Sequence, residues 1–290
     1  MLLLSALISG LGLGSMYGLM ALGFYITYAV SGTVNFAQGS SMMLGAVLCY
    51  LLSVTLHWPI ALAVVAALAL CALWGMLIER VAVRPFVRAG SNAWLMSTVA
   101  AGIVLEQSVM FTFGKEPRSL VLPVSGEAFS LGGLAVSPLQ VAILVVAIAV
   151  ALGLTAFARH TRYGKALAAI VQNPSAAGLM GIDVTRAVMY CYAASTVLAG
   201  IAGILIAPLF AVSADMGTLF GVKAFAVAIL GGLGSARGVV LAGFAFGLVE
   251  ALITSMLGSA YTNILAFVLV IVALAIRPHG LLGTSGVKKV

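Results

Sequence analysis

The chain has 290 residues, of which 63% are hydrophobic and only 7% are charged, and its net charge at pH 7 is +7. So few charged side chains cannot cover a water-soluble surface, and a mean hydropathy of +1.23 is typical of a polytopic membrane protein. The positive charge does not indicate nucleic-acid binding, because the basic residues lie in short loops between apolar runs. We expect a single membrane domain over residues 1–290.

The apolar runs predict an all-α fold of about eight or nine transmembrane segments, some of them broken. Crossing the hydrocarbon layer takes roughly 20 helical residues, and the run at 222–233 is shorter, so we expect a broken or tilted helix there. The predicted helices cover residues 3–30, 38–54, 60–78, 93–113, 139–158, 187–209, 222–233, 239–257 and 264–276.

Lys and Arg residues fix the predicted orientation. Counting the spans places four basic segments on one face, which should be cytoplasmic, with the N-terminus outside and the C-terminus inside. These segments contain Arg80, Arg84 and Arg88; Arg159, Arg162, Lys165 and Arg186; Arg237; and Arg277, Lys288 and Lys289.

The predicted outer face is close to neutral. The longest outer loop, at residues 114–137, contains prolines and several Gly and Ser residues and should be an irregular exposed connection. Its face carries Lys115, Arg118 and Lys223, balanced by Glu116, Glu127 and Asp215.

Cysteine and histidine residues give no sign of a disulfide or a metal site. Cys49, Cys71 and Cys191 fall in apolar runs and are unpaired in spacing, and the three histidines lie in separate loops. We expect the cysteines to be small packing residues. No removable signal peptide is expected, since no Lys or Arg precedes the first apolar run.

Glycines are frequent within the predicted spans. We expect them to allow close approach of helix backbones, because lipid gives little hydrophobic drive for helix association. Tight packing alone, or a direct part in transport, would explain them. Examples are Gly14 and Gly18, Gly200 and Gly203, and Gly243 and Gly247.

The segment at residues 164–182, GKALAAIVQNPSAAGLMGI, resembles a further span but contains a polar centre. As a span it would bury Gln172, Asn173 and Pro174 and would move every later basic loop outside. As a cytoplasmic segment it fits well, because Asn173 is a good N-cap, Pro174 suits the first helical position, and Gly181 suits the left-handed C-terminal position. The sequence predicts a short helix of about two turns, preceded by a turn or two around residues 165–170.

This short helix has an apolar surface without a local partner. It carries Ala177, Leu179, Met180 and Ile182, and a helix of this length is not stable alone in water. Two partners for this apolar surface remain possible. The helix packs back on the inner face of its own chain, or it docks on a soluble protein.

Residues 31–41, SGTVNFAQGSS, place polar side chains and two glycines between apolar runs. Irregular backbone at membrane depth is tolerated only where protein or a water-filled cavity satisfies it, and broken helices often line solute routes. The alternatives are a pathway-lining segment and an ordinary cytoplasmic turn. In either case Phe36 could supply an apolar contact.

Two carboxylates lie in the middle of predicted spans, Glu106 and Glu250. Each costs roughly 2.5–3.5 kcal/mol on insertion scales, so each should face the bundle interior, protonated or paired. We expect a functional role for Glu250, with a structural hydrogen bond as the alternative, and a structural role for Glu106.

The sequence contains no nucleotide-binding motif of the form G-x-x-x-x-G-K-[ST]. The glycine-rich run at 231–238, GGLGSARG, lacks a Lys and a preceding strand, which favours a tight turn over a phosphate loop. If transport is active, ATP must be hydrolysed on a partner. A short rigid helix between two spans would transmit the movement.

Four sequence blocks give the chain a family resemblance. They are NFAQG at 35–39, GKAL at 164–167 continuing to AAGLMGI at 176–182, AF at 224–225 through LGGLGSARG at 230–238, and RPHGLLG at 277–283. With these blocks, in this order, the chain resembles the LivH-type permease subunit of branched-chain amino acid ABC importers. Ala168 departs from the family, which commonly has Arg there, and this puts one polar contact with the ATPase in doubt.

The resemblance implies an ABC importer permease fold in a bacterial inner membrane and assigns roles to residues. The loop at 159–186 would hold the helix that couples to the ATPase, and its candidate residues are Gly164, Lys165, Asn173, Pro174, Ala177, Gly178, Leu179, Met180 and Gly181. Candidates for the substrate pathway are Asn35, Phe36, Gln38, Gly39, Lys223 and Glu250.

The resemblance also implies the partners. They are two ATP-binding subunits that carry ATP and Mg²⁺, a second homologous permease subunit and a periplasmic substrate-binding protein. The permease itself would bind no cofactor and catalyse nothing. Its cargo would be branched-chain or other hydrophobic amino acids, or a related small solute. The competing hypotheses are a passive solute channel, an ion-coupled secondary transporter that uses Glu106 and Glu250, and a membrane anchor.

Overall fold

The computed structural model describes residues 2–120, 129–131, 134–136, 138–276, 280 and 282. Eight helices in this part of the chain are long and apolar enough to cross a membrane, within the predicted number, and α10 is shorter. The helices are α1 (Leu2–Ser31), α2 (Gln38–Tyr50), α3 (Ile60–Leu77), α4 (Arg84–Arg88), α5 (Trp94–Phe113), α6 (Pro138–His160), α7 (Arg162–Gln172), α8 (Pro174–Leu179), α9 (Val184–Phe210), α10 (Met216–Gly231), α11 (Ala236–Leu257) and α12 (Ser259–Ile276).

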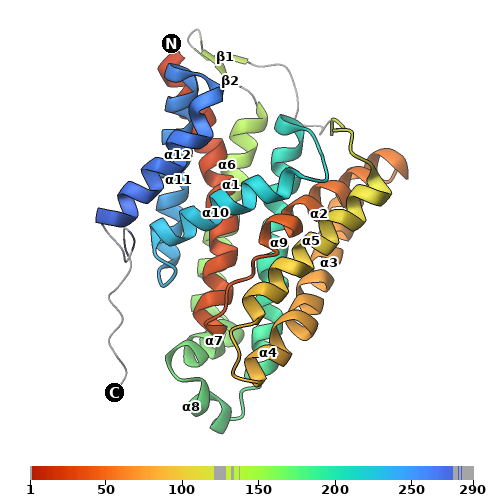
Figure 1. Ribbon diagram of the computed structural model, residues 1–290, viewed down its shortest axis with the longest axis vertical. Coiled ribbons are helices and arrows are strands. Elements are labelled where there is room, and N and C mark those ends of the chain that lie inside the picture. Colours follow the sequence, from red (N-terminus) through yellow and green to blue (C-terminus); the bar gives the residue numbers. More distant parts are fainter. Residues whose placement is uncertain are drawn as a thin grey trace.

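The long helices run between two ends of the molecule (Figure 1). One end carries the N-terminus and a small antiparallel hairpin of β1 (Phe129–Leu131) and β2 (Leu134–Val136). The other end carries α4, α7 and α8. The short helix α10 crosses the bundle obliquely, as predicted for a span too short to run straight through.

Several boundaries differ from the predicted ones. The third span does not end near 78 but continues through the π-helical segment Ile78–Val83 into α4, where the Arg84 Nη2 is 2.6 Å from the Glu79 Oε2. This ion pair neutralises the buried Glu79 carboxylate and lets the helix extend past it. The segment before α8 is an 11-residue helix, α7, rather than a turn or two.

Glycines bring the helix backbones together, as predicted. A Cβ atom added to Gly14 on α1 would lie 2.8 Å from the carbonyl oxygen of Gly243 on α11. One added to Gly45 on α2 would lie 2.5 Å from the Cα of Gly200 on α9. No real Cβ fits at such distances, so these helix pairs depend on the missing side chains.

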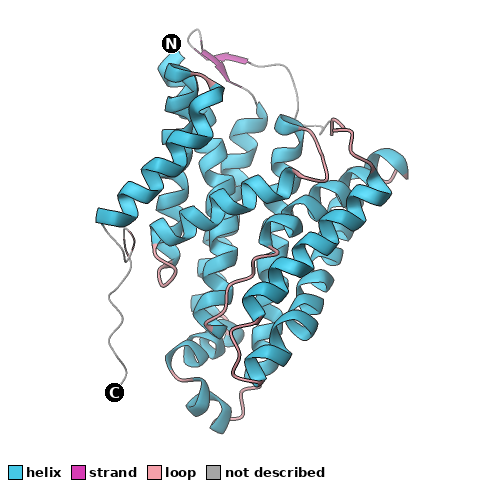
Figure 2. Cartoon of the chain, in the orientation of Figure 1, coloured by secondary structure: helices cyan, strands magenta, loops and turns pink. Residues whose placement is uncertain are grey.

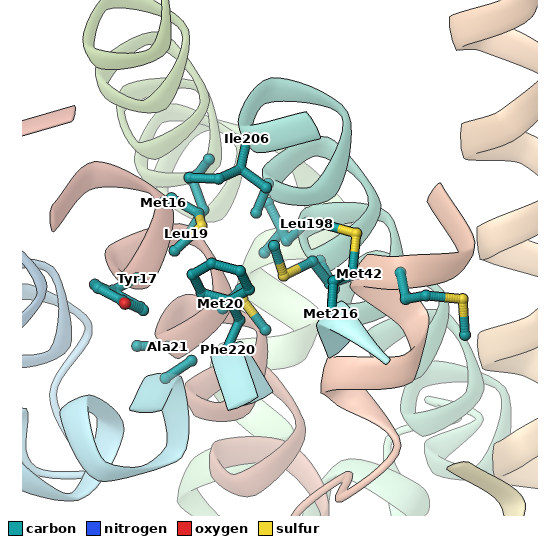
Figure 3. Packing of buried hydrophobic residues seen from close by; sticks show 14 of the residues in the cluster. Met16, Tyr17, Leu19, Met20, Ala21, Met42, Leu198, Ile206, Met216 and Phe220 are labelled. Atoms are coloured by element: carbon teal, nitrogen blue, oxygen red, sulfur yellow. The ribbon is translucent and has the colours of Figure 1, made fainter. Parts of the chain in front are cut away.

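The apolar core lies where α1, α2, α9 and α10 meet (Figure 3). Met16, Met20 and Met42 are fully buried there, and flexible Met side chains fill irregular gaps between helices. The ring of Tyr17 packs edge-on against Phe246 of α11 at 5.3 Å between centroids. All three cysteines are buried and free, which agrees with the packing role expected for them.

The outer connection is more ordered than predicted where the structure describes it. The backbone of Arg118 pairs with that of Val212, with hydrogen bonds of 2.9 and 2.8 Å, and its guanidinium lies 4.5 Å from the centre of the Phe113 ring. Glu127 of this loop lies outside the described residues, and so do Arg277, Lys288 and Lys289 of the predicted basic tail.

Candidate functional site

A loop of two short helices, α7 and α8, joins α6 to α9 at the end of the bundle that holds α4 (Figure 1). The side-chain oxygen of Asn173 accepts a hydrogen bond from the Ala176 N–H at 3.0 Å, and Pro174 takes the first position of α8. Gly181 follows with φ of +84°, a left-handed conformation that favours glycine. The N-cap, the first-position proline and the terminal glycine are confirmed.

The short helix α8 has a buried side and an exposed side. Ala177 is 4% exposed and belongs to a small apolar cluster with Ile170 and Cys191. Leu179 and Met180 are 90% and 84% exposed. Of the two partners considered for this helix, its own chain therefore covers Ala177, while Leu179 and Met180 remain uncovered.

The rest of the predicted coupling set divides in the same way. Gly164 is buried, and a Cβ added to it would lie 2.5 Å from the Cα of Ala158, so only glycine lets α7 fold back closely on the end of α6. Lys165 and Gly178 are exposed, and a Cβ on Gly178 would meet nothing within 4 Å. Gly178 is therefore an open position beside the two exposed apolar side chains.

Within the predicted broken segment, residues 31–41, only residues 32–37 are non-helical; they leave the end of α1 and turn back into the bundle before α2 begins (Figure 2). Asn35 and Gln38 are both 0% exposed, so the segment is not an exposed turn. The Asn35 Oδ1 accepts from the Ala37 N–H at 3.1 Å, while its Nδ2 has no partner among the described residues. The Phe36 ring lies 5.0 Å from that of Phe225 on α10.

The first turn of α2 is held between α9 and α10. The Gln38 Nε2 donates to the Ser195 carbonyl at 3.0 Å, and the Ser195 Oγ lies 2.9 Å from the Gln38 Oε1. On the other side, a Cβ added to Gly221 of α10 would lie 2.8 Å from the Cα of Gly39. The polar side chain and the glycine thus let a broken helix pack at the centre of the protein.

A buried ion pair joins α10 to α11. The Lys223 Nζ is 2.5 Å from the Glu250 Oε1, and the two side chains are 4% and 9% exposed. In the described part of the chain, the second carboxylate oxygen, the Glu250 Oε2, has no hydrogen-bond partner, and neither has the buried hydroxyl of Tyr17. The prediction that Glu250 faces inward and is paired is confirmed.

The position of Lys223 corrects the predicted count of outer-face charges. We placed Lys223 at the outer start of a helix beginning at 222, but α10 begins at Met216, and Lys223 lies half-way along it. Its ammonium group is buried and paired with the Glu250 carboxylate, so it adds no net charge to the outer face.

The structure brings some of the predicted residues together and leaves others apart. Phe36, Gln38 and Gly39 meet α9 or α10 within the bundle, whereas α8 lies at its end (Figure 1). Ser195 was not among the predicted site residues, although a polar residue in the middle of an apolar run was a visible signal. The sequence also predicts no specific partner for Glu106, whose Oε2 accepts a hydrogen bond from the Thr218 Oγ1 of α10 at 2.8 Å.

The chain has recognisable relatives. A family model described as "Branched-chain amino acid transport system / permease component" matches residues 6–274. The chain belongs to this family. The permease is 33% identical to the high-affinity branched-chain amino acid transport system permease protein BraD of Pseudomonas aeruginosa, over 99% of this chain and 98% of BraD. It is 31% identical to LivH of Escherichia coli K12, over 99% of this chain and 97% of LivH.

A more distant relative and a solved structure extend the comparison. A probable LivH of Methanocaldococcus jannaschii is 29% identical to the permease, over 92% of this chain and 88% of that protein. A chain of the structure "PsaBC from Streptococcus pneumoniae in complex with Fab" covers 93% of the permease and 91% of its own length, with a TM-score of 0.51 and 15% identity, a likeness of fold. The permease is therefore a multi-pass membrane protein and the membrane component of a transport system.

Proposed function

We propose that the permease is the translocation subunit of an ATP-driven importer for branched-chain or other hydrophobic amino acids. A partner ATPase would dock on α8. The observation that carries the docking is the exposure of Leu179 and Met180 on a helix whose other side is anchored to the permease. Burying two such side chains on a partner is worth roughly 3–6 kcal/mol.

The energy source supports the same arrangement. The sequence contains no G-x-x-x-x-G-K-[ST] motif, so nucleotide hydrolysis is assigned to two ATP-binding subunits that hold ATP and Mg²⁺. The helices α7 and α8 connect α6 to α9, and a push on α8 would move these two spans relative to each other. A second, homologous permease subunit and a periplasmic substrate-binding protein complete the proposed assembly.

Basic residues support a cytoplasmic position for α8. Arg88 of α4 and Arg162 and Lys165 of α7 belong to helices at the same end of the bundle (Figure 1). Positive residues in short loops favour the cytoplasmic face, which places the N-terminus and the β1–β2 hairpin in the periplasm. The proposed location is a bacterial inner membrane.

The cargo is proposed from the relatives, since BraD and LivH are named for branched-chain amino acid transport. The test is uptake by proteoliposomes that contain the permease, its ATP-binding partners and the cognate binding protein. Labelled leucine, urea and an aromatic carboxylate are compared with ATP and without it. ATP-dependent leucine uptake is the expected result. Uptake without the ATPase would contradict the proposal and favour a channel or a secondary transporter.

The docking surface is tested in the same proteoliposomes. The double variant Leu179→Asp/Met180→Asp should insert normally but lose copurification of the ATPase and ATP-driven uptake. Leu179→Met is the matched control, because it keeps an apolar side chain of similar size, and it should behave like the unaltered permease. Normal uptake by the double Asp variant would remove α8 as the docking element.

A further inference from the structure

A second carboxylate of the spans, Glu106, is held quite differently from Glu250. It lies on α5, twelve residues after Trp94 and seven before Phe113, which is about 18 Å and about 10 Å along the helix axis. These distances from the two ends of α5 place Glu106 well inside a hydrocarbon layer about 30 Å thick. Glu106 is nevertheless not buried, and neither is Thr218, whose hydroxyl donates to its Oε2 at 2.8 Å.

One hydroxyl cannot replace the water around a carboxylate. A carboxylate has two oxygens with about four acceptor sites, and leaving these sites unsatisfied in lipid is unfavourable. Glu250 meets this demand with the ammonium group of Lys223, but Glu106 forms no ion pair within the described residues. A charged Glu106 needs water or a polar group of another molecule at its remaining acceptor sites, and an aqueous space on this side of α5 would supply both.

The adjoining surface of α10 is apolar. Thr218, Val222 and Phe225 follow one another at helical spacing and form one strip along α10. Val222 is 52% exposed, and Phe225 is partly exposed and contacts Phe36 of the broken segment. A carboxylate beside a strip of apolar side chains is complementary to a solute with an ammonium group at one end and a hydrocarbon group at the other.

We propose that Glu106, oriented by Thr218, contacts the ammonium group of the solute as it moves along the surface formed by α5 and α10. The assignment of an amino acid to this surface rests on the proposed function. The aqueous position of Glu106 does not, because it follows from burial and charge alone. An experiment can therefore contradict the amino-acid assignment and leave the aqueous position of Glu106 standing, or the reverse.

Thiol chemistry in the complete importer tests both the position and the charge. Val104 provides a matched control, because it is 63% exposed and two residues away on the same helix, about 200° round the axis. The native cysteines are buried at 0–3% exposure and give little background. A negatively charged sulfonate thiol reagent and a positively charged ammonium thiol reagent are applied to Glu106→Cys and to Val104→Cys.

We expect both reagents to modify Glu106→Cys and neither to modify Val104→Cys. Glu106→Cys should transport leucine at least about tenfold more slowly, the size expected for losing a hydrogen bond to a charged group. The sulfonate reagent should restore uptake because it returns a negative charge, and the ammonium reagent should not. Absence of modification at position 106, or equal modification at 104, would overturn the aqueous position. Equal rescue by both reagents would overturn the role of the charge.

A second variant guards against misfolding. Glu106→Gln keeps an acceptor for the Thr218 hydroxyl and removes only the charge. It should assemble with the ATPase normally and still lose about tenfold in uptake rate. Uptake at the unaltered rate would refute the ammonium contact. If the reagents reach position 106 while the importer proves to carry a solute without an ammonium group, the proposed cargo and the ammonium contact fail together and the aqueous surface stands.

Discussion

Replacing Lys223 by Met tests how strongly the buried ion pair joins α10 to α11. The Met side chain keeps most of the apolar length of Lys and removes the ammonium group. The Glu250 carboxylate, 9% exposed and 2.5 Å from the lost Nζ, is then left buried without its partner. Removing one member of such a pair costs roughly 3–5 kcal/mol. A chain of 290 residues has an unfolding entropy of about 0.6 kcal/mol/K, so we expect a fall in Tm of about 5–8 °C.

The double variant Lys223→Met/Glu250→Met distinguishes the effect of an uncompensated charge from the effect of altered packing. Replacing both members of a buried pair with apolar residues is often neutral or stabilising, so its Tm should return close to that of the unaltered permease. The assay is thermal unfolding of the purified permease in detergent, followed by tryptophan fluorescence. A double variant as unstable as Lys223→Met would refute the reasoning, since an uncompensated charge would not be the cause. Loss of uptake by a stable double variant would support the predicted pathway role of the pair.

Three further substitutions have defined expected results. Asn173→Ala removes the cap of α8, should cost about 1 kcal/mol in local helix stability, and should lower ATPase stimulation in reconstituted importer. Gln38→Leu removes the two hydrogen bonds between Gln38 and Ser195, worth roughly 1–3 kcal/mol together, while the Ser195 hydroxyl keeps the Gly23 carbonyl as acceptor. It should impair uptake more than ATPase binding, and equal loss of both would indicate a folding role. Gly45→Leu should prevent α2 from meeting Gly200 of α9, measured as loss of monodisperse protein on gel filtration.

The sequence by itself determined the features that depend on a few neighbouring residues. The apolar runs specified a polytopic helical protein, and the basic loops gave a predicted orientation. Asn173, Pro174 and Gly181 specified the start and end of α8, because capping geometry involves only residues within one helical turn.

Only the tertiary structure decided which helix faces meet. Glu250 pairs with Lys223, 27 residues away in the sequence, and Gln38 forms hydrogen bonds with Ser195, 157 residues away. It also decided that Ala177 is covered by its own chain while Leu179 is not. The physical reason is that an apolar helix face is equally compatible with lipid and with another helix, so composition cannot say which side is inside. Glycine contacts and buried polar partners make that choice, and both come from helices far apart in the sequence.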